Sequence, residues 1–192
     1  MPRAGLTPRI VGEEASRVAD EGGLDRLTLA AVATRLGVAL PSLYKHVRGM
    51  DALQQGIATG AVRELTAVLT TAAVGRAGRD ALAALADAYR DYAHRHPGRY
   101  AATLRAPRAD DPAHVAAGVA AVDVIYAVLA GYGLSGPAAI DATRVLRSAL
   151  HGFVSLEAAG GFGIPQDVDR SFARLVDALH QALRAWPDSD QL

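Results

Sequence analysis

Apolar residues recur at helical spacing along almost the whole chain, and no segment keeps the strict alternation of a half-buried strand. The first helix is predicted to begin at Pro8, because Thr7 is a good cap and proline suits the first helical position, where no N–H is needed. Gly22 and Gly23 are predicted to end it. Its apolar residues at helical spacing are Val11, Ala15, Val18 and Ala19.

Two short helices are predicted to follow the first. Thr28 is the cap of the second helix, residues 29–36, and Gly37 ends it. The third helix is predicted over residues 40–47. A helix, a glycine-containing turn and a second short helix form the helix-turn-helix arrangement.

Six mostly longer helices are predicted after a change in composition near residue 48. Each break between them is rich in glycine or proline. Their predicted ranges are 50–73, 79–95, 97–105, 112–131, 137–159 and 166–185. The pattern predicts an all-α protein of about nine helices, with three short helices before residue 48 and six mostly longer helices after it.

The third helix has two chemically different faces. Leu43 and Val47 lie one turn apart and point the same way, so this face can dock on the first two helices. The other face carries Pro41, Ser42, Tyr44 and Lys45. The major groove of DNA admits one helix, and hydroxyl and ammonium groups can donate to phosphates. A solvated surface helix carries the same residue types, so this pattern alone leaves DNA contact and a plain surface equally open.

Composition sets broad limits on function. The 192 residues include 20 basic and 20 acidic ones, so DNA binding has to be argued from local chemistry rather than from net charge. The absence of cysteine excludes disulfides and thiolate metal sites. The N-terminus lacks the apolar run of a signal peptide, and no uninterrupted apolar run reaches the length of a membrane span. We therefore expect a soluble cytoplasmic protein with no membrane partner.

Residues 7–66 resemble the DNA-binding domain of the TetR family of bacterial transcriptional regulators. The segment GVALPSLYKHV is especially similar to the family's tetracycline repressors. The residues that carry the resemblance are Thr28, Val32, Ala33, Leu36, Gly37, Val38, Leu43, Tyr44, His46, Val47 and Leu53.

The resemblance implies two kinds of DNA contact. The residues implied to meet the phosphate backbone are Thr28, Tyr44 and His46. Those implied to face the major groove are Leu40, Pro41 and Ser42, where the apolar two can contact thymine methyl groups. Lys45 is implied to read either a base or a phosphate.

Two positions depart from the family pattern. Ala39 stands where a capping serine is often found, and Met50 stands where lysine is common. Loss of that lysine removes one phosphate contact, for which Arg48 can substitute.

The resemblance also implies a homodimer that binds a palindromic operator in double-stranded DNA, with its last two long helices packed against those of its partner. The predicted interface residues are Leu146, Leu150, Phe153, Phe172, Leu175, Leu179 and Leu183. His151-Gly152 and Leu156-Glu157 are similar to the signature of a WHG-type C-terminal domain, although Arg147 replaces its usual tryptophan.

The resemblance implies a helix-turn-helix domain with three helices at its N-terminal end, residues 7–66, followed by a larger helical ligand-binding and dimerisation domain, residues 67–187. An effector pocket is expected in the second domain, between about residues 79 and 131. The region is rich in Ala, Val and Leu, which favours a small apolar or amphipathic molecule. The candidate pocket residues are Tyr89, Tyr92, Arg105 and Tyr126.

Motifs for other chemistry are weak or missing. Residues 131–136 match GxGxxG but follow an alanine-rich helix, so they are interpreted as a helix–helix turn rather than a dinucleotide site. His94 and His96 diverge on a helix, so no metal site is expected. We expect no cofactor and no catalytic residues, because no nucleophile motif or acid–base cluster is present.

The sequence therefore predicts a ligand-responsive transcriptional regulator, most simply a repressor that a small molecule releases from its operator. Two alternatives remain. One is an enzyme on an all-helical fold. The other is a TetR-like helical dimer with weakened DNA contacts, acting as a ligand-binding or scaffolding protein.

Overall fold

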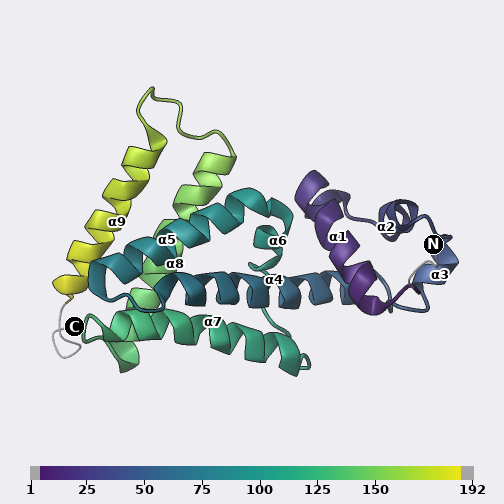
Figure 1. The fold of residues 1–192 in the computed structure, drawn as a ribbon, viewed down its shortest axis with the longest axis horizontal. Helices are drawn as coiled ribbons and strands as arrows, with labels where there is room; N and C mark the ends of the chain where they lie inside the picture. The colour runs from purple at the N-terminus through teal and green to yellow at the C-terminus, as the bar shows by residue number, and fades with distance from the viewer. Residues whose placement is uncertain (1–4, 187–192) are drawn as a thin grey trace. The chain divides into compact units, whose positions relative to one another are not determined.

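A computed structural model of the chain describes residues 5–186, and these are helical with no strand among them (Figure 1). The α-helices are α1 (Pro8–Gly22), α2 (Leu29–Leu36), α3 (Leu40–Leu43), α4 (Met50–Ala73), α5 (Gly78–Arg95), α6 (Pro97–Ala102), α7 (Pro112–Ala130), α8 (Gly136–Ala158) and α9 (Val168–Arg184). A short 3₁₀ turn, η1 (Leu24–Arg26), joins α1 to α2. The all-α prediction and the predicted order of nine helices are confirmed over the described residues.

The predicted start of the first helix is also confirmed. The Thr7 hydroxyl accepts a hydrogen bond from the Ile10 N–H at 3.2 Å, and Pro8 occupies the first turn. The largest differences in length occur at two short helices. Helix α6 ends at Ala102 rather than at residue 105, and α3 ends at Leu43 rather than at residue 47.

The described chain divides into two compact units. The N-terminal unit contains residues 5–64 and 95–118, and the C-terminal unit contains residues 65–94 and 119–186. The first division lies close to the predicted boundary at residues 66 and 67, but the N-terminal unit also takes in α6 and the start of α7. Residue 187, the predicted end of the second domain, lies outside the described residues.

The core of the N-terminal unit is built on α1. Its buried face contributes Val11, Ala15 and Ala19, all fully buried. The side chains that complete this core come from the other helices of the unit: Leu27, Val32, Ala33, Leu43, Leu53, Ile57, Ala58, Ala61 and Ala102. Removal of this apolar surface from water fixes the positions of α2 and α3 against α1 and the first half of α4.

Helix α6 is held tightly against α1. A Cβ atom at Gly98 would lie 2.1 Å from the backbone carbonyl carbon of Ala19, so only glycine permits this approach. The Asp20 carboxylate accepts a hydrogen bond from the Arg99 N–H at 2.8 Å and lies 3.2 Å from the Arg99 Nε. His96 Nδ1 lies 3.4 Å from the same carboxylate. Close backbone packing at Gly98 and the charge of Asp20 therefore hold α6 against α1.

In the C-terminal unit, α8 and α9 contact each other and lie side by side (Figure 1). An ion network fixes their ends to α5. The Arg90 guanidinium binds Glu157 on α8 and lies 2.8 Å from Asp169 on α9. It also lies over the Phe172 ring, 4.8 Å from the centroid. The hydrogen bond from Arg90, followed by one from His94, lowers the pKa of Glu157.

Among the described residues, α7 is the one helix long and apolar enough to cross a membrane by length and composition. The core helices of soluble proteins pass the same test, and α7 carries Asp123. This apolarity is weak support for a membrane span.

We predict that Gly98→Ala destabilises the protein by at least about 2 kcal/mol, because the added methyl group collides with the backbone of α1. Gly118→Ala is the matched control, since a Cβ there meets nothing within 4 Å and alanine favours a helix. Denaturant unfolding of both variants measures the difference. Equal stabilities for the two variants would contradict the close approach of α6 to α1.

We predict that Glu157→Gln lowers the free energy of unfolding by about 1–2 kcal/mol at pH 7, because Arg90 loses its ionised partner. The folded-state pKa of Glu157 is depressed, so its contribution is present above the ordinary value of 4.5 and is lost as the pH falls below it. The difference between variant and parent should therefore narrow in acid. Asp141→Asn, in an exposed pair with Arg144, should change stability little at any pH.

Candidate nucleic-acid interface

Helices α2 and α3 are joined by a tight turn whose geometry depends on Gly37. The Thr28 hydroxyl caps α2 by accepting from the Ala31 N–H at 3.0 Å. At the other end, Gly37 adopts the left-handed conformation (φ 65°), and the Val38 N–H reaches back to the Ala33 carbonyl at 3.0 Å. This pattern satisfies the last carbonyls of α2 and turns the chain toward α3.

Helix α3 is a single turn, four residues long, and the predicted extension to Val47 is wrong. Ala39 provides no side-chain cap, and Pro41 has no N–H to donate. The His46 N–H bonds the Leu43 carbonyl three residues back at 2.8 Å, so residues 44–46 continue as a turn rather than as an α-helix. The chain remains compact as far as Val47, whose N–H also bonds the Leu43 carbonyl.

All eight residues predicted to contact DNA lie in the N-terminal unit, and none is fully buried. Ser42 and His46 are half-buried. The exposed ones are Thr28, Leu40, Pro41, Tyr44, Lys45 and Arg48. Leu43 is 0% exposed and anchors the segment, so Leu40 and Tyr44 remain in solvent at 37% and 57% exposure. The residues predicted to contact DNA on α3 and in the turn after it are therefore at least partly accessible to solvent.

Most arginines of the N-terminal unit are neutralised by carboxylates of the same unit. Arg35, for example, bridges Glu14 and Glu21 and so ties α2 to α1. The paired arginines are Arg9, Arg17, Arg35, Arg99, Arg105 and Arg108.

Four cations of this unit have no such pair with a carboxylate of the described chain: Arg26, Lys45, Arg48 and Arg63. Lys45 and Arg48 are in or next to the predicted contact surface, where their charge is available to phosphates.

Met50 has a structural role at the start of α4. Its side chain is partly buried and packs against the core of the N-terminal unit. The departure from lysine at this position therefore adds apolar contact, while the exposed Arg48 lies two residues earlier.

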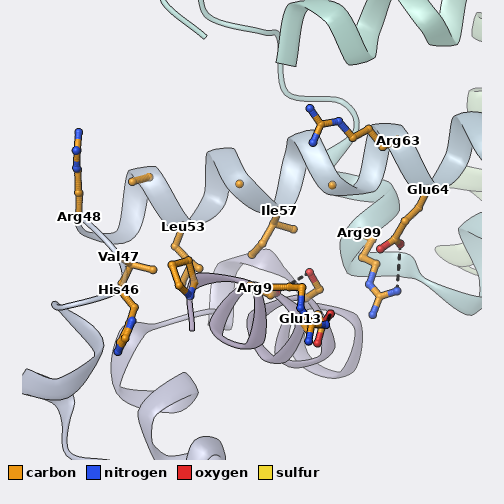
Figure 2. Close-up of a pocket in the computed structure, with 16 residues that line it drawn as sticks. Arg9, Glu13, His46, Val47, Arg48, Leu53, Ile57, Arg63, Glu64 and Arg99 are labelled. Carbon is orange, nitrogen blue, oxygen red and sulfur yellow. Dashed lines mark hydrogen bonds and ion pairs between the residues drawn. The ribbon is translucent and has the colours of Figure 1, made fainter. Parts of the chain in front are cut away.

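A groove of about 540 Å³ adjoins this surface and lies between α1 and α4 (Figure 2). One end is at His46 and Arg48, immediately after α3, and the other is at Glu64 and Arg99. Sequence patterns did not predict this groove, because its lining comes from segments far apart along the chain.

The four candidate pocket residues do not lie together in one unit. Tyr89 and Tyr92 on α5 are buried in the C-terminal unit, and Tyr126 on α7 is half-buried there. Arg105 belongs to the N-terminal unit, where it binds Asp51 and donates to Gln54 at 2.9 Å. Ion pairing within the N-terminal unit thus already occupies the Arg105 guanidinium.

Most of the residues predicted for the dimer interface lie in the core of a single protomer. Phe153 and Leu175 are half-buried. The other five are at most 7% exposed: Leu146, Leu150, Phe172, Leu179 and Leu183. A side chain buried within its own chain is not available to a second copy, so these five are corrected to core residues. The apolar periodicity of these two helices therefore marks side chains that are buried within one protomer.

The N-terminal unit also contains a buried polar cluster that the sequence patterns did not predict. Gln55 Nε2 lies 3.0 Å from Asp111 Oδ2 and 2.9 Å from His114 Nδ1, and His114 is 1% exposed. Hydrogen bonds from the His114 backbone N–H and then from Gln55 lower the pKa of Asp111. The only signal in the sequence was an isolated histidine within an apolar helix.

His94 and His96, which were considered as a pair of metal ligands, contact different carboxylates. His94 binds Glu157 in the C-terminal unit at 2.8 Å, and His96 lies beside Asp20 in the N-terminal unit. The GxGxxG match lies between α7 and α8, with helix on both sides, as interpreted from the sequence.

Two family models match this chain. The model for bacterial regulatory proteins of the tetR family matches residues 13–57, which include α2, α3 and the start of α4. The model for the tetracyclin repressor-like C-terminal domain matches residues 82–179.

Similar proteins include two regulators and one solved structure. An uncharacterised HTH-type transcriptional regulator of Mycobacterium tuberculosis, Rv0681, is 41% identical over 86% of this chain and 75% of its own length. The uncharacterised HTH-type transcriptional regulator YobS of Bacillus subtilis is 33% identical over 90% of both chains. A protein of unknown function from Rhodococcus sp. RHA1 superposes with a TM-score of 0.78 at 28% identity, over 95% of this chain and 98% of its own.

We predict that Thr28→Ala lowers the free energy of unfolding by about 1 kcal/mol, because the Ala31 N–H loses its cap. Thr28→Ser should keep most of the stability, since its hydroxyl can accept the same bond. Thr34→Ala is the control, because the Thr34 hydroxyl only bonds the Ala30 carbonyl within α2. Denaturant titration separates the three variants, and equal losses at both threonines would argue against the cap.

Proposed function

The chain belongs to the TetR family of bacterial transcriptional regulators and is therefore a DNA-binding regulator rather than an enzyme, and we propose that it is a homodimeric repressor released from a palindromic operator by a small molecule. The single observation that carries the proposal is the exposed helix-turn-helix surface described above. Leu43 is fully buried beneath it, while Tyr44, Lys45 and Arg48 are exposed.

In the proposed complex, α3 enters the major groove. Leu40, Pro41 and Ser42 form its leading edge, where apolar atoms can contact thymine methyl groups and the hydroxyl can reach a base edge. The turn after α3 carries Tyr44 and Lys45 toward the phosphates.

The phosphate contacts are expected on either side of α3. Thr28 lies at the start of α2, and His46 and Arg48 follow α3. With these residues on flanking segments, phosphate binding would fix the register of α3 on the duplex.

A second copy is needed because one near-neutral domain provides few contacts. A dimer would place two recognition helices one DNA turn, about 34–36 Å, apart on a palindrome. We propose that the partners meet through the outward faces of α8 and α9. On α8 this face carries Val145, Ser148, Gly152 and Leu156, which recur at helical spacing opposite the buried stripe. Val145 and Leu156 are 43% and 52% exposed, which leaves apolar surface for the partner to cover.

The effector is proposed to bind in the C-terminal unit near the candidate tyrosines of α5 and α7. Tyr89, Tyr92 and Tyr126 combine an apolar ring with a polar end, which suits an amphipathic molecule. Its binding would favour a conformation with a different spacing of the two recognition helices, and operator affinity would fall by that difference in binding energy.

We predict that the double variant Tyr44→Ala, Lys45→Ala loses specific binding to DNA taken from beside its own gene. Fluorescence anisotropy across a salt series measures this. Lys45→Ala alone should reduce the slope of log affinity against log salt by about 0.9 per lost phosphate contact in each protomer. The reason is that Lys45 has an exposed charge with no carboxylate partner in the described chain.

Arg26→Ala is the matched control for that experiment. Arg26 is also an exposed cation of the N-terminal unit without a carboxylate partner among the described residues, but it lies outside the contact surface. Helical content and sedimentation should be unchanged in all variants. Unaltered operator affinity in the double variant would refute the assignment of α3 as the recognition helix and would favour a dimer without DNA contacts.

A further inference from the structure

The groove between α1 and α4 has the size and lining of a small-molecule site, and it lies entirely within the N-terminal unit. Its volume of about 540 Å³ falls within the range of ligand pockets. Val47, Leu53 and Ile57 form its apolar floor. Arg9 with Glu13 lies on the α1 side, and an ion pair between Arg99 and Glu64 closes one end (Figure 2).

Three glycines keep the groove open: Gly12 on α1, and Gly56 and Gly60 on α4. Each lies inside a helix, where glycine is less stabilising than alanine. None has a positive φ, and a Cβ at any of the three would meet nothing within 4 Å. Neither backbone conformation nor packing within the protein therefore requires glycine at these positions. Larger side chains would instead fill the groove.

The charge around the groove is positive. The carboxylates in its lining, Glu13 and Glu64, each pair with an arginine of the same lining. Arg48 and Arg63 also line the groove, and neither pairs with a carboxylate of the described chain. Figure 2 shows Arg63 extending from α4, and Arg48 from the segment just before α4, both into open space. An occupant with an anionic group would supply the partner that these two guanidinium groups lack.

We propose that this groove is a second small-molecule site, separate from the effector pocket of the C-terminal unit, and that it binds a flat amphipathic anion. The apolar body would lie on the floor beside the glycines, and a carboxylate or sulfonate would be bound by Arg48. Arg is suited to this role because its planar guanidinium donates two parallel hydrogen bonds to such a group.

Occupancy of the groove would interfere directly with DNA binding, a step that rests on the proposed function. His46 and Arg48 line the groove and are also proposed phosphate contacts. A ligand anion bound by Arg48 would replace a DNA phosphate, so ligand and operator would compete. In the effector mechanism proposed for the C-terminal unit, by contrast, the effector lowers operator affinity without contacting the DNA-binding residues.

The site is tested on the full chain without DNA, by glycine-selective isotope labelling and NMR, with the aromatic anion anilinonaphthalenesulfonate as the probe. The signals of Gly12, Gly56 and Gly60 are assigned by their loss in single alanine variants. We expect these signals to shift on titration and that of Gly118, outside the groove, to stay in place. Arg48→Gln should weaken the affinity read from the groove signals about tenfold. Arg26→Gln, the matched exposed arginine, should leave it unchanged.

Two results would overturn the site: groove glycine signals that do not move while the probe binds elsewhere, or equal affinity in Arg48→Gln and the parent protein. Competition is then measured by adding operator DNA to the probe complex. Probe binding that leaves operator affinity unchanged would overturn the competitive mechanism. Failure of the protein to bind DNA even without probe would instead count against the proposed function, and the NMR result on the groove would still stand.

Discussion

The helix-turn-helix surface that we propose reads DNA depends on the burial of one side chain, Leu43. A four-residue helix cannot hold its own shape in water, because the first turn of a helix fixes several residues for a single hydrogen bond. Leu43 is fully buried in the core formed by α1, α2 and α4, and the turn at Gly37 delivers it there. The position of every residue around it, from Leu40 to Arg48, follows from that contact.

That core is in turn joined to α6 by a close contact between two backbones. Gly98 lies against the backbone of α1 at Ala19, and the Asp20 carboxylate fixes the first turn of α6. A displacement of α6 therefore cannot be absorbed by side-chain rearrangement at this contact, since backbone lies against backbone. The same joint explains why residues 95–118 form one compact unit with residues 5–64, although a long stretch of chain separates them.

The sequence predicted the helices well because their ends are chemically marked. Thr7, Thr28 and Gly37 act as caps and stops through local hydrogen bonds, which are encoded within a few residues. The packing partners of the helices were harder to predict. Apolar periodicity located the stripe at Leu146 and Leu150 but could not tell whether it faces a neighbouring helix or a second protomer. The groove was also missed, because it exists only where α1 and α4 pack together.

The internal pairing of arginines has a consequence for the search for an operator. Attraction to DNA of arbitrary sequence comes almost entirely from unpaired positive charge. In the N-terminal unit, Arg35, Arg99 and Arg105 are held by carboxylates of the same unit. Few molecules of such a protein would be sequestered on the millions of competing chromosomal sites, because each offers only phosphates. A modest number of copies per cell would then suffice to keep an operator occupied.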